Sequence, residues 1–459
     1  MKSFLSQMDQ HTSKCIGENG HIQESWSNEI RQKIVQLYFQ LVRSKNHTEL
    51  KSEFHKILGY FVGKEVQYNV EFKLIIKMIA NVRDITNGKG EQQLSFMMLF
   101  VLWDYYPEIA KFIFIKYLSM GKDEHCLGSY KDVKYLCNYI KDQSKNVNHP
   151  FIEYILYVCV DILRSEEQKF KRDESNSLFC KWFPREKSKK FGWINRKFAK
   201  MYYSNIMSTA NNFNKNFKAE RKCYTKLRKL LANINRKIDT TQIKMTGKNW
   251  KLIDFNKVTG PTIRKHKLAF QNKTSQNQTR YNDTDRVICT ENFKNYLSLA
   301  KEGKVSVKAK RVDMYKLVKD AMFTKTEEDI DLVNEQWKNN SELNEDMSHY
   351  IIPMGDVSSS MDVDDSIPMY NSIGFSIRVS EKTHPDFRHR VMTFATNPSW
   401  VQFSEHMTFH QKVNMLKNDS NWSGSTNFYK ALQMILDVIV ENNIPPTDVE
   451  KMILAIFSD

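Results

Sequence analysis

The chain has 459 residues, of which 41% are hydrophobic and 12% aromatic, so it can bury a substantial core, and its length predicts two or three domains. Its formal net charge is +16, yet residues 351–459 hold 8 Lys and Arg against 13 Asp and Glu. This composition excludes a disordered chain. The basic excess before residue 351 favours a polyanion-binding part joined to a part with another role.

The cysteines and the apolar runs indicate where the protein works. The seven cysteines are scattered, without a C-x-x-C pair or a His-spaced cluster, which predicts reduced thiols in a cytosol-like compartment and excludes a zinc site. The start, MKSFLSQMDQHTSK, lacks the apolar core of a signal peptide, and the longest apolar runs are too short to span a membrane. We therefore expect a cytoplasmic protein that has no membrane partner.

The N-terminal part is predicted to be helical. From Glu24 to about Leu231, apolar residues recur at helical spacing, for example in EIRQKIVQLYFQLV (29–42) and EQQLSFMMLFVLWDYY (91–106). No strict repeat period is present, so an irregular solenoid-like array of helix pairs and a compact bundle both stay open. We expect a basic helical domain over residues 24–325.

A glycine-bearing stretch in this part, RDITNGKGEQQL (83–94), contains Gly88, Lys89 and Gly90. It lacks the spacing of a phosphate-binding loop and no strand precedes it, so we reject a nucleotide site here. The glycines more plausibly end one helix and begin the next.

The positive charge is concentrated between Lys169 and Lys267, which hold 27 Lys and Arg against 6 Asp and Glu. Within this region, residues 181–203 interleave cations with Trp182, Phe191, Trp193 and Tyr202. Cations that neutralise phosphates beside aromatic faces that stack bases are typical of single-stranded nucleic-acid binding. The alternative is a core-facing aromatic stripe with a solvated lysine face. The excess of Lys and Arg over Asp and Glu in this region favours a polyanion partner. The candidate nucleic-acid-binding residues are Lys187, Lys189, Lys190, Arg196, Lys197 and Lys200.

Two further segments lead to the C-terminal part. The polar stretch 272–285 reads as an exposed loop, and the acidic residues 326–349 read as a connecting helix. Residues 350–459 then alternate short β-rich runs with amphipathic helices, which predicts an α/β domain with a largely parallel sheet. The expected fold class is thus α plus α/β, with a helical array followed by a partial doubly wound domain.

Five oxygen-bearing side chains are placed near predicted strand ends of this domain. Asp356 follows one apolar run and Asp459 ends another, while the hydroxyls come from Ser358, Ser360 and Thr426. If the two strands are neighbours, these groups converge at the carboxyl edge of the sheet. Two carboxylates with neutral hydroxyls suit Mg²⁺ and leave it able to bind a carboxylate of an acidic protein partner.

This set resembles the metal-ion-dependent adhesion site of von Willebrand factor A domains, with D-x-S-x-S after one strand, Thr426 in a glycine-bearing loop and Asp459 after a later strand. A complete domain of that family continues beyond the last motif, whereas this chain ends at Asp459. We therefore expect a domain incomplete at its C-terminus: a fragment, or a domain that a partner completes.

Four stretches, RDITNGKGEQQL, KWFPREKS, NWKLIDFNKV and MGDVSSSM, together resemble an uncharacterised family of plants, fungi and giant DNA viruses that joins a basic helical region to a von Willebrand A domain. That family resembles in turn the Ro autoantigen and its TROVE module, so the resemblance implies RNA binding. The Lys-, Asn- and Ile-rich composition fits an A+T-rich genome such as that of a giant virus, for which the location would be the host cytoplasm or the virion.

Two functions follow as hypotheses. The first is a non-enzymatic RNA-binding or ribonucleoprotein-associated protein with a metal-ion-dependent adhesion-type site. The alternative is a metal-dependent protein interaction module without a nucleic-acid role. A hydrolase is not expected, because no histidine is placed by a motif to activate a serine nucleophile.

Overall fold

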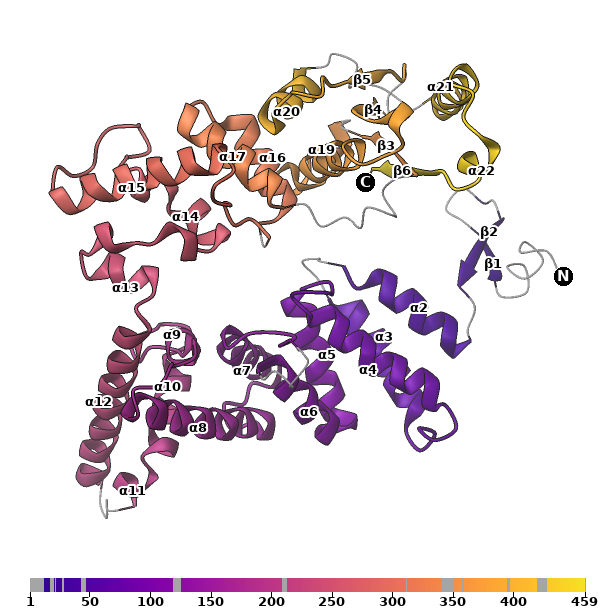
Figure 1. Ribbon diagram of the computed structural model, residues 1–459. Helices are drawn as coiled ribbons and strands as arrows, with labels where there is room; N and C mark the ends of the chain where they lie inside the picture. Colours follow the sequence, from indigo (N-terminus) through magenta and orange to yellow (C-terminus); the bar gives the residue numbers. More distant parts are fainter. Residues whose placement is uncertain are drawn as a thin grey trace. The chain divides into compact units, whose positions relative to one another are not determined.

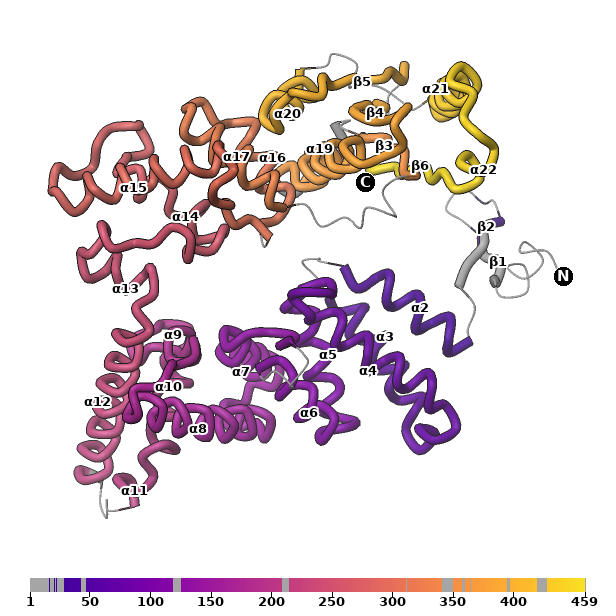
Figure 2. Tube along the Cα trace, viewed as in Figure 1, coloured from indigo at the N-terminus to yellow at the C-terminus, as the bar shows by residue number. Residues whose placement is uncertain are grey.

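The computed structural model describes residues 12–16, 20, 22–26, 29–42, 47–118, 125–208, 213–310, 312–340, 350–356, 359–393, 397–418 and 427–458 (Figure 2). The chain forms two compact units, Met1–Thr240 and Thr241–Asp459 (Figure 1).

Over its described residues, the first unit is helical apart from one hairpin, in which β1 (Thr12–Ile16) pairs antiparallel with β2 (Ile22–Trp26). Its helices are α2 (Ile30–Gln40), α3 (Thr48–Phe61), α4 (Asn69–Arg83), α5 (Gln92–Tyr105), α6 (Pro107–Leu118), α7 (Lys131–Ser144), α8 (Pro150–Lys171), α9 (Phe179–Trp182), α10 (Gly192–Tyr202), α11 (Ser204–Met207) and α12 (Phe213–Ile238). The predicted helical character is confirmed, but the described helices begin at Ile30, because Glu24 lies within a strand.

Helix α5 lies at the centre of the first unit. Every residue from Leu94 to Leu102 is buried, as expected for a helix that is apolar around its whole circumference. It contacts α3, α4, α6 and α7, and contacts between α7 and α8, α8 and α10, and α10 and α12 continue the packing. Most contacts therefore join helices close in the chain, which is the pattern expected of a helical array.

The second unit begins with helices and ends with a sheet. Its helical elements are α13 (Thr241–Thr246), η1 (Trp250–Leu252), η2 (Phe255–Lys257), α14 (Gly260–Phe270), α15 (Thr284–Lys301), α16 (Met314–Phe323), α17 (Glu327–Lys338), η3 (Ser359–Met361), η4 (Asp364–Ser366), α19 (Ile367–Ser380), η5 (Pro385–Phe387), α20 (Phe409–Asn418), α21 (Phe428–Glu441) and α22 (Pro446–Val449). Its strands are β3 (Ile351–Gly355), β4 (Arg390–Thr393), β5 (Trp400–Gln402) and β6 (Ile453–Phe457).

The sheet is small and mixed, with strand order β5-β4-β3-β6. Strand β3 pairs in parallel with β4 and with β6, whereas β4 and β5 pair antiparallel. Ile352 and Met354 of β3 share an apolar cluster with Ile435 of α21, while a side chain at Gly355 would meet Ser376 of α19. Because alternate residues of a strand point to opposite faces, α21 and α19 cover opposite faces of the sheet.

Helix α17, which forms in the predicted acidic segment, packs against helices that follow it in the chain. The ring of Trp337 in α17 stacks on Phe409 of α20 with centroids 3.8 Å apart, and Arg378 Nη2 donates a hydrogen bond to Trp337 O at 2.8 Å. Helices α14–α17 therefore belong to the same compact unit as the sheet, because their apolar side chains are covered there. Residues 341–349 lie outside the described residues, and the domain bounds 24–325, 326–349 and 350–459 stay a prediction.

Candidate nucleic-acid and metal sites

The predicted metal site begins where β3 and β6 end side by side. Gly355 is in register with Phe457, so Asp356 and Ser458 leave the sheet at the same edge. Asp356 N donates to Phe457 O at 3.0 Å, and Ser458 Oγ donates to Asp356 Oδ2 at 2.6 Å. Asp356 is only 4% exposed. The condition that the two strands be neighbours is thus met.

Of the other four predicted oxygen ligands, the structure describes only one. Ser360 lies in η3 and is exposed, whereas Ser358, Thr426 and Asp459 lie outside the described residues. Within the described ranges, no group of three or more His, Cys, Asp and Glu side chains could hold a metal ion. Asp356 and Ser458 offer hard oxygen donors of the kind Mg²⁺ prefers, so the described donors fit such an ion in part.

The aromatic side chains of the predicted nucleic-acid segment pack mainly against the first unit. Trp182, Phe191, Trp193 and Tyr202 are half-buried and border its core. Tyr202 Oη donates to Glu167 Oε2 at 2.6 Å. Four stacking platforms in a row are therefore not available on this surface.

The six predicted basic residues divide into four that are exposed and two that form ion pairs within the protein. Lys187, Lys189 and Lys190 are exposed in the turn between α9 and α10. Lys197 Nζ donates to Asn148 Oδ1 at 2.7 Å and forms an ion pair with Glu153.

The remaining two of the six are Lys200 and Arg196. Lys200 Nζ lies 2.9 Å from Glu220 Oε1. Arg196 is exposed, and its Nη1 makes one long contact of 3.4 Å to Glu186 O. Lys197 and Lys200 are thus engaged within the protein, whereas Arg196 remains accessible.

Helix α12 carries the more continuous basic surface. Its 26 residues contain nine Lys and Arg against one Glu. Lys218, Lys222, Lys226 and Lys229 recur at intervals of four, four and three residues, so they share one face of the helix, and all four are exposed. Within the part of the chain that the structure describes, no ion pair involves these four lysines. We call these four residues the α12 stripe.

The opposite face of α12 explains why the stripe is exposed. Cys223, Leu227 and Ile234 are buried in the core of the first unit, which fixes the rotation of the helix. The regular spacing of the lysines is visible in the sequence, and it could have singled out these residues had helical periodicity been applied to the charges as it was to the apolar residues.

A second basic surface, on α14, α15 and the loop between them, is neutralised. Lys267 Nζ lies 3.1 Å from Asp329 Oδ2, and Lys301 Nζ lies 2.5 Å from Asp331 Oδ2. Glu328 of α17 accepts from both Lys273 and Lys294, at 3.2 and 3.1 Å. We call Lys267, Lys273, Lys294 and Lys301 the paired lysines; the acidic face of α17 covers them.

The loop over residues 83–94 has a structural role. Lys89 Nζ donates to Tyr38 O at 2.5 Å and to Leu41 O at 3.1 Å, so it binds carbonyls at the end of α2. A side chain at Gly88 would lie 2.0 Å from Asn81 O, which restricts this position to glycine. Helix α4 ends before this loop and α5 begins after it, as predicted.

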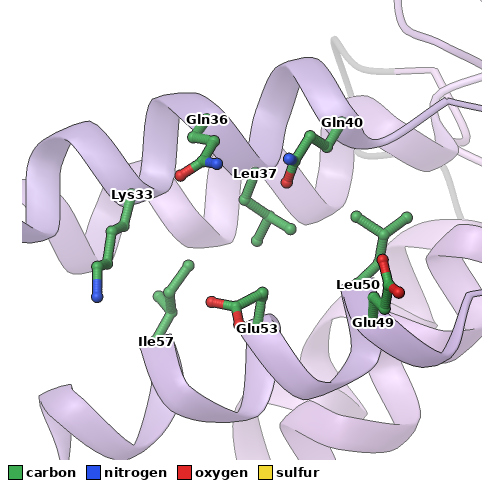
Figure 3. Close-up of a pocket in the computed structure, with 8 residues that line it drawn as sticks. All are labelled: Lys33, Gln36, Leu37, Gln40, Glu49, Leu50, Glu53 and Ile57. Carbon is green, nitrogen blue, oxygen red and sulfur yellow. The ribbon is translucent and has the colours of Figure 1, made fainter. Parts of the chain in front are cut away.

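A groove between α2 and α3 does not favour a polyanion. Figure 3 shows Lys33, Gln36 and Gln40 of α2 opposite Glu49 and Glu53 of α3. Two carboxylates against one ammonium group repel phosphates, so this groove does not extend the basic surface.

Comparisons with known proteins cover both parts of the chain. Residues 350–459 match a family model described as "Domain of unknown function (DUF7788)". The match begins where the sequence changes to alternating strands and helices. The chain is also 24% identical over 443 residues to an uncharacterised protein, L728, of Acanthamoeba polyphaga mimivirus, covering 93% of this chain and 69% of that protein. No solved structure gave a significant match.

Neither match carries an enzymatic description. Among the described helices, none is long and apolar enough to cross a membrane. The chain is therefore similar to an uncharacterised giant-virus protein, and it contains a helix-rich part followed by a small mixed sheet.

Proposed function

We propose that the protein is a non-enzymatic RNA-binding protein that acts in a ribonucleoprotein. The observation that carries the proposal is the α12 stripe, in which four exposed lysines on one helix face make no ion pair within the described residues. At a rise of 1.5 Å per residue, Lys218 and Lys229 are about 16 Å apart along the helix axis. A row of this length can contact several consecutive phosphates of a nucleic-acid strand.

The resemblance to the TROVE module and to von Willebrand A domains supports RNA as the polyanion. In this proposal the helical part takes the RNA, and the C-terminal part carries an adhesion-type metal site. The similarity to a giant-virus protein supports a location in the host cytoplasm or the virion.

The proposal is tested by filter binding of the full chain to structured and single-stranded RNA over a range of salt concentrations. Release of counterions makes the logarithm of the affinity fall linearly with the logarithm of the salt concentration. We expect about a 10³-fold loss of affinity between roughly 50 and 200 mM salt if about six phosphates are contacted. Absent binding, or binding that salt does not weaken, contradicts the proposal.

A second candidate function is a metal-dependent protein interaction module. It is favoured by Asp356 and Ser458 at the ends of parallel neighbouring strands. In this proposal Mg²⁺ would be held by Asp356, Ser358, Ser360, Thr426 and Asp459, and an acidic residue of the partner would complete its coordination.

Isothermal titration with Mg²⁺ tests the second candidate. The variant Asp356→Ala removes the buried carboxylate, while Asp437→Ala removes an exposed carboxylate of α21 and is the matched control. We expect Mg²⁺ binding that only Asp356→Ala abolishes. Equal binding by both variants contradicts a metal site at Asp356, and it leaves the RNA proposal untouched.

A further inference from the structure

A pocket of the first unit lies between the start of α8 and helices α10, α11 and α12. It has a volume of about 630 Å³, is open on one side, and falls within the range of known ligand pockets. Its apolar walls are the side chains of Trp193, Met201, Met207 and Tyr224. Nothing in the proposed electrostatic contact of the stripe uses this pocket.

The basic residues of the pocket have distinct roles. Lys197 and Lys200 are fixed by Glu153 and Glu220 respectively, so they form rigid walls. Arg196 also lines the pocket, and its guanidinium is exposed at the opening. Because Lys197 and Lys200 are each paired with a carboxylate, it is the guanidinium of Arg196 that favours an anionic group on the ligand.

Trp193 supplies a further signal. Its side chain is half-buried and lines the pocket. Lys141 Nζ lies over the same ring, 5.6 Å from its centroid. A flat ligand that is attached to a phosphate matches an aromatic and thioether wall beside an exposed arginine.

We propose that the pocket takes an unpaired nucleobase of a single-stranded RNA, with the adjoining phosphate bound by Arg196. The π-face of a base packs against the aromatic and thioether side chains that line the pocket. A base within a duplex is stacked and paired, so it cannot enter. The inference rests on the proposed RNA-binding function and adds a preference for single strands.

Two adjacent residues of α11 provide a matched test. Ser204 and Asn205 are both exposed, but only Ser204 lines the pocket. Ser204→Trp therefore fills the pocket without removing a buried group, and Asn205→Trp adds the same bulk outside it. Affinities of the full chain are measured by fluorescence anisotropy for a labelled single-stranded RNA and for an RNA duplex with the same number of phosphates.

We expect Ser204→Trp to lower the single-strand affinity about 10-fold, in line with the loss of one stacked base, and to leave the duplex affinity within about 2-fold. Asn205→Trp should change neither affinity. If both variants bind the single strand as the wild type does, the pocket inference is overturned while RNA binding stands. If the wild type binds neither RNA, the proposed function and the pocket inference both fail.

Photo-cross-linking gives an independent readout. A single-stranded RNA containing 4-thiouridine should cross-link to the peptide that spans residues 193–207, and Ser204→Trp should abolish that cross-link. Cross-links confined to the α12 stripe in the wild type would overturn the inference.

Discussion

Two basic surfaces of this protein differ in what their charges contact. The α12 stripe faces away from the core of the first unit, and its lysines make no ion pair within the described residues. The paired lysines of α14, α15 and their connecting loop instead contact three acidic side chains near the start of α17, those of Glu328, Asp329 and Asp331. Both surfaces contribute to the same sequence-level excess of positive charge. Availability of charge is therefore a property of the fold, which a count of residues does not reveal.

The two surfaces should therefore differ in how strongly they attract a polyanion. A neutralised pair presents little net field beyond its own dimensions at physiological ionic strength, whereas unpaired lysines in a row add their fields. We therefore expect RNA affinity to depend on the α12 stripe and to be insensitive to the paired lysines.

Reversal of charge in the α12 stripe has the largest expected effect. The variant Lys218→Glu, Lys222→Glu, Lys226→Glu and Lys229→Glu should lower RNA affinity about 100-fold or more and reduce the salt slope by about four, because each lysine is expected to contact one phosphate. Filter binding at several salt concentrations measures both quantities.

The matched control replaces the four paired lysines by glutamine. This control should bind RNA within about 3-fold of the wild type, since its lysines are already engaged. Equal losses of RNA affinity in the two quadruple variants would show that net charge decides binding, and would contradict a difference between the two surfaces.

Removal of the carboxylates of α17 should have the next largest effect on RNA affinity. Glu328→Gln, Asp329→Asn and Asp331→Asn together should expose the paired lysines and raise RNA affinity about 3- to 10-fold with a steeper salt slope. The same variant should lower the free energy of unfolding by about 1–2 kcal/mol, because half-buried ion pairs are lost. Urea denaturation and filter binding check the two outcomes; an unchanged salt slope contradicts the explanation.

A single paired lysine should matter little. Lys294 is 56% exposed in its ion pair with Glu328, so Lys294→Gln should change the free energy of unfolding by less than about 1 kcal/mol and RNA affinity by less than about 2-fold. A tenfold loss of affinity would show that Lys294 contacts RNA directly.

The smallest effect concerns Glu220, the acidic residue of α12. The hydrogen bond from Lys200 Nζ lowers the pKa of Glu220, and this effect outweighs burial, which would raise it. A pKa that is lower in the folded state means that the ionised carboxylate stabilises the protein at neutral pH, and that this contribution is lost as the pH falls through the lowered value. The difference in unfolding free energy between the wild type and Glu220→Gln should therefore be largest near pH 7 and vanish once the pH has fallen below the lowered pKa of Glu220. A difference that persists at low pH would assign the effect to packing.

Local sequence patterns predicted most of the C-terminal fold. The alternation of strands and helices expected over residues 350–459 is present, with α20 over Phe409–Asn418 and strands at Ile351–Gly355 and Ile453–Phe457. The alternation of apolar residues with short polar breaks is a local pattern, so it can be recognised from the sequence without knowledge of the tertiary structure. The hairpin Thr12–Trp26 was missed, because its strands carry no alternating apolar pattern.

The candidate sites were predictable only in part, because they depend on contacts between residues that are far apart in the chain. The order of motifs placed Asp356 beside the end of β6, because parallel neighbouring strands end at one edge. In contrast, the pairing of Lys197 with Glu153 and of Lys267 with Asp329 joins residues far apart in the chain. Sequence spacing cannot reveal such pairs, so it could not separate available lysines from engaged ones.

The most direct test of this account is lysine footprinting, in which the full chain is acetylated with and without RNA and the modified residues are located by mass spectrometry. The account predicts that Lys218, Lys222, Lys226 and Lys229 react readily in the free protein and are protected when RNA is bound, while the reactivity of the paired lysines does not change. Protection of the paired lysines with a fully reactive α12 stripe would contradict it.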